Sequence, residues 1–308
     1  MPPRPRPPRR TPKGVVWRRR LIAFGVLIAG FLVAWFAVDS VGGGGTKTTA
    51  ATSLAAAPPP FRIVFPEGFT REQMAARVDA VAGIAERKRG KKVKLSSKTY
   101  LAATSRPRPE LGFGRRPLEG FLFPATYDFT ARTTSAQLVA KQLEAFRRNW
   151  AKVNLSYARS KNLTPYDVLI IASMIEREVQ VPSERKLVAA VIYNRLHRGM
   201  PLGIDATTRF AVGGSYTEPL TESQLNSPSP YNTRLHVGLP PGPIGNPGLA
   251  AVDAAAHPAM VNYLYFVVKP GTCGQMVFSV TYADAQRRAA AYQRALKAKG
   301  SSPTSCPG

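Results

Sequence analysis

The stretch TPYDVLIIASMIEREV, residues 164–179, decides the fold of the second half of this chain. It opens with Thr164, and Pro165 follows at the first helical position, where the missing N–H costs nothing. An acidic residue, Asp167, stands three positions after the cap, which is typical of a helix start. The sequence therefore predicts a helix over DVLIIASMIEREV.

Glu176 is the most informative residue of this helix. At 100° per residue it lies within about 40° of Leu169 and Ala172, so its carboxyl group points along the apolar stripe. Apolar surroundings disfavour a charged carboxylate and raise its pKa, which suits a general acid that must hold a proton at neutral pH. A buried glutamate paired with Arg185 or Arg195 of the next helix is the other interpretation that the spacing leaves open.

The segments after this helix predict a mainly helical domain with one β-hairpin. ERKLVAAVIYNRLHRG is expected to form a helix that starts near Ser183 and stops at Gly199. YLYFVVKP and QMVFSVT predict a hairpin around residues 271–274. The other expected parts are a loop-rich region at 200–248, a helix at roughly 249–256 and an amphipathic helix from the cap Thr281 to about residue 299.

The segments before it predict a small α/β unit. FRIVFPEGFTREQMAARV (61–78) predicts a strand, a turn at 66–68 and a helix capped by Thr70, and VKLSSKTYLAA (93–103) predicts a second strand and helix. LEGFLFPATYDF (118–129) predicts buried extended chain, because glycine and proline interrupt it. A further helix is predicted by the capping box Thr134–Gln137 and by the apolar stripe Val139, Leu143, Phe146, Trp150 and Val153.

Residues 21–38, LIAFGVLIAGFLVAWFAV, predict a membrane anchor. Eighteen residues without a charge just span a bilayer core as a helix. Three arginines, residues 18–20, precede the segment, so the positive-inside rule places the N-terminus in the cytoplasm and the rest outside. The alternative is a cleaved signal peptide, which would have a shorter apolar core. Residues 1–20 are expected to form a basic disordered tail, and residues 39–60 a flexible linker.

The formal net charge of +25 is extreme, and removing the charges of residues 1–20 still leaves +17. Outside a bacterial membrane such a surface is attracted to anionic wall polymers and lipid headgroups. Nucleic acid is not expected as a partner, because the predicted orientation places the folded part of the chain outside the cytoplasmic membrane. The two cysteines, Cys273 and Cys306, could pair in an oxidising compartment or remain free thiols.

Several polar residues are further candidates for a site. Glu178 could be a second acid or a salt-bridge partner of Arg185. Asp205 could cap a short helix at 206–212. Tyr231, Asn232 and Thr233 occupy a proline-flanked loop that suits sugar hydroxyls and acetamides, although turn formation explains them equally.

Other mechanisms lack the residues that they need. The sequence contains no HExxH motif and only three histidines, so no metal site is expected. It also contains no G-x-S-x-G elbow and no glycine-rich phosphate loop, so we expect neither a serine hydrolase nor a nucleotide cofactor, and no other cofactor is expected.

Six segments occur in a specific order over residues 61–298: FPEGFT, LEGFLFPATYDF, ASMIEREV, SERKLVAAVIYNRL, SPYNT and GLPPGPIGNPGLAAVDAAAHP. The ordered set resembles the MltG (YceG-like) family of endolytic peptidoglycan transglycosylases. The resemblance implies a single-pass membrane protein with a small LysM-like module and a catalytic domain that carries one glutamate, which falls on Glu176. It also makes six residues candidates for substrate binding or support: Asn194, Arg195, Asp205, Tyr231, Asn232 and Thr233. Glu178 and Arg185, considered above from their positions on the helices, complete the set of candidates.

Two departures from the family pattern leave the surroundings of Glu176 open. Gln275 stands where members usually carry a histidine before the second hairpin strand. The segment GIDATTRFA around Asp205 lacks the glutamine and proline that many members have there.

The expected fold class is α+β, with an anchor, a LysM-like α/β module and a mainly helical catalytic domain with a β-hairpin. The expected boundaries are 61–130 for the module and its connecting segment, 131–299 for the catalytic domain and 300–308 for a disordered tail.

The implied reaction cleaves the β-1,4 bond between N-acetylmuramic acid and N-acetylglucosamine and leaves 1,6-anhydro ends. The alternatives are a muramidase with Glu178 or Asp205 as second carboxylate, and a catalytically silent wall-binding scaffold. The expected partners are glycan strands and the membrane, with peptidoglycan synthases as a further candidate.

Overall fold

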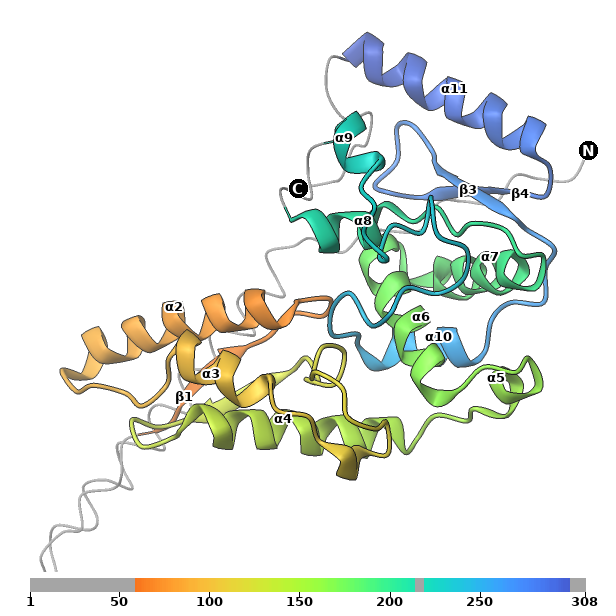
Figure 1. Cartoon of the computed structure of the whole chain (residues 1–308). Coiled ribbons are helices and arrows are strands. Elements are labelled where there is room, and N and C mark those ends of the chain that lie inside the picture. The colour runs from red at the N-terminus through yellow and green to blue at the C-terminus, as the bar shows by residue number, and fades with distance from the viewer. Residues whose placement is uncertain (1–58, 214–218, 300–308) are drawn as a thin grey trace, which may run out of the picture. The chain divides into compact units, whose positions relative to one another are not determined.

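Two separate two-stranded antiparallel sheets are combined with helices in the computed structural model, which describes residues 59–213 and 219–299 (Figure 1). Strand β1 (Phe61–Val64) pairs with β2 (Thr126–Phe129), so that Phe61 lies opposite Phe129. Strand β3 (Tyr265–Val268) pairs with β4 (Met276–Ser279) as the predicted hairpin. The prediction of a mixed helical and sheet fold is confirmed.

The first hydrophobic core lies between the β1–β2 pair and three helices: α2 (Arg71–Arg89), α3 (Ser97–Thr104) and α4 (Ser135–Trp150). We call these five elements, together with the loops that connect them, the N-terminal layer. Helices α2 and α4 both start with a capping box, formed by Thr70 with Gln73 and by Thr134 with Gln137, which satisfies two N–H groups at each helix start. The predicted apolar face of α2 is buried: Met74, Ala75 and Val78.

The prediction of a strand within residues 93–103 is wrong. In the structure Leu95 is buried, and Ser96 caps α3 by accepting a hydrogen bond from the Thr99 N–H. The strand that pairs with β1 is β2, which lies in the segment predicted only as buried extended chain. Because Ser96 is the cap of α3, only residues 93–95 of the predicted segment precede the helix, and they are too few to form a strand.

The second core surrounds α6 (Pro165–Glu178), which packs against α7 (Arg185–His197) and α10 (Leu249–Ala256). Thr164 and Asp167 form a capping box, and Pro165 follows the cap as predicted. All eight residues from Val168 to Ile175 are buried. The remaining elements are α5 (Ser156–Ser160), α8 (Asp205–Val212), α9 (Glu222–Leu225), α11 (Tyr282–Lys299) and two short 3-10 helices (Pro109–Leu111 and Pro182–Glu184).

The hairpin β3–β4 is covered by α11, as Figure 1 shows. The predicted C-terminal order of helix, hairpin and helix is therefore present. Helix α4 packs into the first core, although the sequence-based boundary at residue 131 assigns it to the catalytic domain. The domain boundaries themselves remain predictions.

Asn246 joins the N-terminal layer to the helical part of the protein. Its fully buried side chain accepts a hydrogen bond from the Leu122 N–H (2.8 Å) and donates to Phe69 O (2.8 Å). It also donates to the buried Glu119 carboxylate (2.9 Å), whose second oxygen accepts from the Arg71 N–H. Burial raises the pKa of Glu119 to about 8, so this carboxyl holds a proton more readily than an exposed one.

The predicted basic tail, the anchor at 21–38, most of the linker and the C-terminal tail with Cys306 lie outside the described residues. Within 59–213 and 219–299, no helix is both long enough and apolar enough to cross a membrane. The anchor and the Cys273–Cys306 pairing therefore remain predictions.

We expect Gly120→Ala to destabilise the protein by about 3 kcal/mol or more. Gly120 has φ +88°, and a Cβ there would lie 2.6 Å from Pro243 Cγ. Gly114→Ala is the matched control, because Gly114 has φ +76° with nothing within 4 Å of the added Cβ. The control should lose only about 1–2 kcal/mol, the cost of the left-handed backbone. Equal losses for the two variants in urea unfolding would show that the Gly120–Pro243 contact is unimportant.

Candidate active site

A groove of about 410 Å³ lies where the turn after β1, the end of α6 and the start of α8 meet. These three segments are far apart in the sequence, and each brings one or more carboxyl groups to the groove. The cores on either side fix the segments, so the groove is built on rigid elements. Its lining comprises Glu67, Gly68, Glu176, Arg177, Glu178, Gln180, Asp205, Ala206 and Arg209.

Glu176 sits in the last turn of α6, next to the fully buried Ile175, and only 7% of its side chain is exposed. Its Oε2 accepts a hydrogen bond from the Gly248 N–H (2.9 Å). Burial raises the pKa of Glu176 above its ordinary value, and the charge of Glu67 raises it further. The Gly248 N–H and the Arg185 guanidinium lower it, but the raising effects prevail.

The sequence left open a buried Glu176 that is simply paired with an arginine. The structure identifies Arg185 as the nearby cation, with 3.8 Å between its Nη2 and Glu176 Oε1. That separation is too long for a hydrogen bond, so the pair is a loose one. Arg185 Nε is buried without a hydrogen-bond partner among the described residues. Arg195 instead donates to the carbonyl oxygens of Leu264 and Leu202.

Gly248 is placed beside Glu176 by the loop that follows Gly242. Ser173 of α6 accepts a hydrogen bond from the Ile244 N–H (3.0 Å), which fixes the loop to α6. A Cβ on Gly248 would overlap the Glu67 carboxylate, so a side chain there would displace Glu67 from its position in the groove. Glu67 was not among the residues that the sequence singled out. The available signals were its place in the predicted turn at 66–68 and in the segment FPEGFT.

Glu178 and Asp205 stabilise the start of α8. Glu178 Oε1 accepts a hydrogen bond from the Ala206 N–H (3.3 Å), and burial raises the pKa of Glu178 to about 7. Asp205 is the first residue of α8 and not its cap, which is Ile204, and its carboxylate is bound by Arg234. The suggested salt bridge from Glu178 to Arg185 is not formed, because Arg185 lies against Glu176.

The other predicted support residues hold loops in place. Both Asn232 and Thr233 are buried: Asn232 binds the carbonyls of Leu225 and Ser227, and Thr233 accepts from the Ile204 N–H. Asn194 donates to Val261 O and Tyr263 O, both at 2.8 Å. The ring of Tyr231 packs against Phe210. Of the predicted set, Glu176, Glu178 and Asp205 line the groove, and Arg185 approaches Glu176 from α7.

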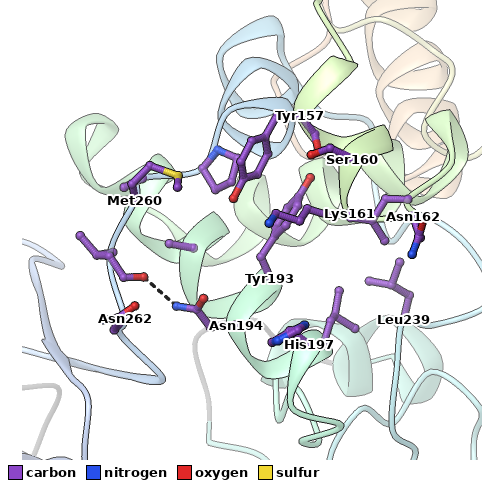
Figure 2. Close-up of a pocket in the computed structure, with 16 residues that line it drawn as sticks. Tyr157, Ser160, Lys161, Asn162, Tyr193, Asn194, His197, Leu239, Met260 and Asn262 are labelled. Atoms are coloured by element: carbon purple, nitrogen blue, oxygen red, sulfur yellow. Dashed lines mark hydrogen bonds between the residues drawn. The ribbon is translucent and has the colours of Figure 1, made fainter.

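A second pocket, of about 690 Å³, lies between α5, α7 and residues 258–262 (Figure 2). Figure 2 shows Tyr157 and Tyr193 on one side of it and Asn194, hydrogen-bonded to Val261, on another. Its lining residues in the described structure include no carboxyl group, which is the kind of acid that the sequence predicts. The smaller groove with Glu176 is therefore the candidate active site.

Residues 42–291 match the YceG-like family. The chain belongs to this family. It is 34% identical over 234 residues to the endolytic murein transglycosylase of Bacillus subtilis (strain 168), a match that covers 73% of this chain and 63% of that protein. It is 33% identical over 243 residues to the endolytic murein transglycosylase of Streptococcus pneumoniae (strain ATCC BAA-255 / R6), covering 74% of this chain and 44% of that protein. The chain thus spans less than two thirds of the length of these two relatives.

The fold of this YceG-like protein is similar to that of a solved relative. The crystal structure of a yceG-like protein from Listeria monocytogenes matches with a TM-score of 0.60 and 30% sequence identity. The match covers 74% of this chain and 75% of the Listeria chain.

We expect Glu178→Gln to reduce the pH dependence of stability. The folded-state pKa of Glu178, about 7, lies above the ordinary value of 4.5. This carboxyl therefore contributes stability at low pH, and the contribution is lost as the pH rises through about 7. Glutamine keeps an acceptor for the Ala206 N–H but cannot ionise, so the variant should gain stability relative to the wild type between about pH 5 and pH 8. Urea unfolding across that range measures the difference, and Glu144→Gln, at an exposed site on α4, is the control. Parallel pH curves for the wild type and Glu178→Gln would contradict the expectation.

Proposed function

We propose that this YceG-like protein is an endolytic murein transglycosylase that cleaves glycan strands of peptidoglycan. Its substrate bond is the β-1,4 linkage between N-acetylmuramic acid and N-acetylglucosamine, and its product ends in a 1,6-anhydro ring. The observation that carries the proposal is one buried carboxyl, Glu176, with a raised pKa at the wall of a groove. Two relatives named endolytic murein transglycosylase, at 33–34% identity, support the same reaction.

The chemistry follows from a single group that changes roles. Protonated Glu176 gives its proton to the glycosidic oxygen as the sugar ring gains oxocarbenium character. The resulting carboxylate then takes a proton from the C6 hydroxyl of the same muramic acid. That hydroxyl attacks the anomeric carbon and closes the 1,6-anhydro ring, so the nucleophile is intramolecular. No second carboxylate is needed to activate water, in contrast to ordinary glycosidases.

The geometry around Glu176 suits both halves of this cycle. Burial favours the neutral acid before cleavage. The Gly248 N–H and the Arg185 guanidinium then stabilise the carboxylate that is left after proton transfer. Because the arginine contact is long, it does not hold the carboxyl permanently in the charged form.

A hydrolase of the same bond is the second candidate, because the groove holds further carboxylates that could activate water. Two of these are already engaged, since Glu178 accepts from the Ala206 N–H and Asp205 binds Arg234. Their engagement favours the transglycosylase. A silent wall-binding scaffold is the third candidate, and it would need no proton on Glu176.

Glu176→Gln should abolish cutting while binding of glycan strands is retained. Loss of a general acid costs about 10²–10⁴-fold in rate, so cleavage of purified strands should fall by at least about 10²-fold. Mass spectrometry of the wild-type products identifies the reaction: anhydro ends indicate the transglycosylase, and reducing ends indicate a hydrolase. Unchanged cutting by Glu176→Gln would remove Glu176 from the mechanism.

We also propose that the protein is a single-pass membrane protein whose catalytic part faces away from the cytoplasm. Residues 21–38 would be the anchor, and the N-terminal layer would include a LysM-like module that contacts the wall. The tether would confine cutting to strands near the bilayer, including newly made strands, where peptidoglycan synthases also act. Cells that carry only a secreted, unanchored form should therefore show altered glycan strand lengths. Strand lengths identical to those of wild-type cells would count against the tether.

A further inference from the structure

Glu67 is the carboxylate that the N-terminal layer contributes to the described lining of the groove. It lies in the turn directly after β1, and this turn is fixed from two sides. Arg177 of α6 donates to Gly68 O (3.0 Å), and the Gly68 N–H donates to Asn246 O (2.8 Å). The position of Glu67 relative to α6 is therefore set by hydrogen bonds and not by the side chain alone.

Both Glu67 and Glu176 contact the same glycine. The Gly248 N–H donates to Glu176 Oε2, and the space that a Gly248 side chain would need is filled by the Glu67 carboxylate. A Cβ on Gly68 would in turn lie 3.5 Å from Glu176 Cγ, so the turn itself packs on the side chain of Glu176. The N-terminal layer thus forms one wall of the pocket that holds the catalytic carboxyl.

In the described part of the chain, Glu67, Arg185 and the Gly248 N–H act electrostatically on Glu176 from the elements packed around it. Glu67 faces it from the turn after β1, Arg185 from α7, and the Gly248 N–H from the start of α10. Arg185 and the N–H favour the charged carboxylate, whereas the negative charge of Glu67 disfavours it. Of the neighbouring groups on α6, Glu178 is turned toward Ala206.

We infer that Glu67 is a positioning residue of the active site: its carboxylate, packed against Gly248, places a negative charge beside Glu176 that disfavours the charged form of that carboxyl. The inference rests on the proposed transglycosylase function and assigns different roles to Glu176 and Glu67. Glu176 transfers the proton, while burial and, after it, the charge of Glu67 oppose the Gly248 N–H and Arg185, which favour loss of that proton. The N-terminal layer is then part of the catalytic apparatus, because it carries a residue that adds to the effect of burial on the charge state of Glu176.

The test compares Glu67→Gln, Glu67→Asp and Glu144→Gln in the full-length protein. Two quantities are measured: the pH profile of anhydro-product formation, and the titration of Glu176 by NMR of ¹³C-labelled glutamate, with Glu176→Gln to assign its signal. Glu67→Gln removes the like charge, so the Glu176 titration and the alkaline limb of the profile should both move about one unit toward acid. Glu67→Asp keeps the negative charge, so its Glu176 titration and its alkaline limb should both stay close to those of the wild type. Glu144→Gln removes an exposed charge on α4 and should change neither quantity.

The outcomes separate this inference from the proposed function. A Glu176 titration that is the same in Glu67→Gln and in the wild type, with the fold retained by circular dichroism, would overturn the role of Glu67. A loss of rate with an unmoved alkaline limb would likewise make Glu67 a purely structural residue. Absence of anhydro products from the wild type would instead refute the transglycosylase, whatever the titration shows. If Glu67→Gln does not fold, Glu67→Ser removes the same charge with a smaller side chain.

Discussion

The structure depends on placing one carboxyl group at the end of a helix that is otherwise buried. Helix α6 has apolar or small residues all around its middle turns, and these form the centre of the second core. Glu176 continues that buried surface by one residue, so its side chain loses nearly all contact with water. A carboxyl in such a place is costly to ionise unless a donor meets it. The loop to α10 supplies that donor through the Gly248 N–H.

The need to place this donor explains much of the rest of the fold. The loop that ends at Gly248 is held to α6 by Ser173 and to the N-terminal layer by Asn246. Asn246 uses both ends of its amide while it is completely buried, so it allows little freedom in how the two cores meet. The turn with Glu67 and Gly68 is held to α6 by Arg177, which donates a hydrogen bond to Gly68 O. The two cores are therefore joined through polar groups that are specific in direction, in addition to the apolar contacts that Leu169 and Tyr166 of α6 make with the first core. The groove lies at this junction.

Competition between burial and charge sets the chemistry of the groove. A close, hydrogen-bonded arginine would hold Glu176 in the ionised state, but Arg185 stays 3.8 Å away. Burial and the charge of Glu67 then prevail, and the pKa of Glu176 rises. Glu178, two residues further on, is partly buried, and its carboxyl group is hydrogen-bonded to the start of α8. Two neighbouring glutamates on one helix thus have different tasks, because the next segment of chain meets each of them differently.

The sequence by itself determined the helices whose start signals are local. Capping boxes at Thr70, Thr134 and Thr164, the proline after Thr164 and the glycine-containing hairpin turn act over a few residues, so they can be recognised without knowledge of the fold. Helical periodicity likewise placed Glu176 on the buried face. Only the tertiary structure decided that β1 pairs with β2 across some sixty residues, that Arg185 and not Arg195 approaches Glu176, and that Glu67 shares Gly248 with it. These contacts join segments that are distant in the chain, and they depend on how two cores pack together, which no local pattern of residues encodes.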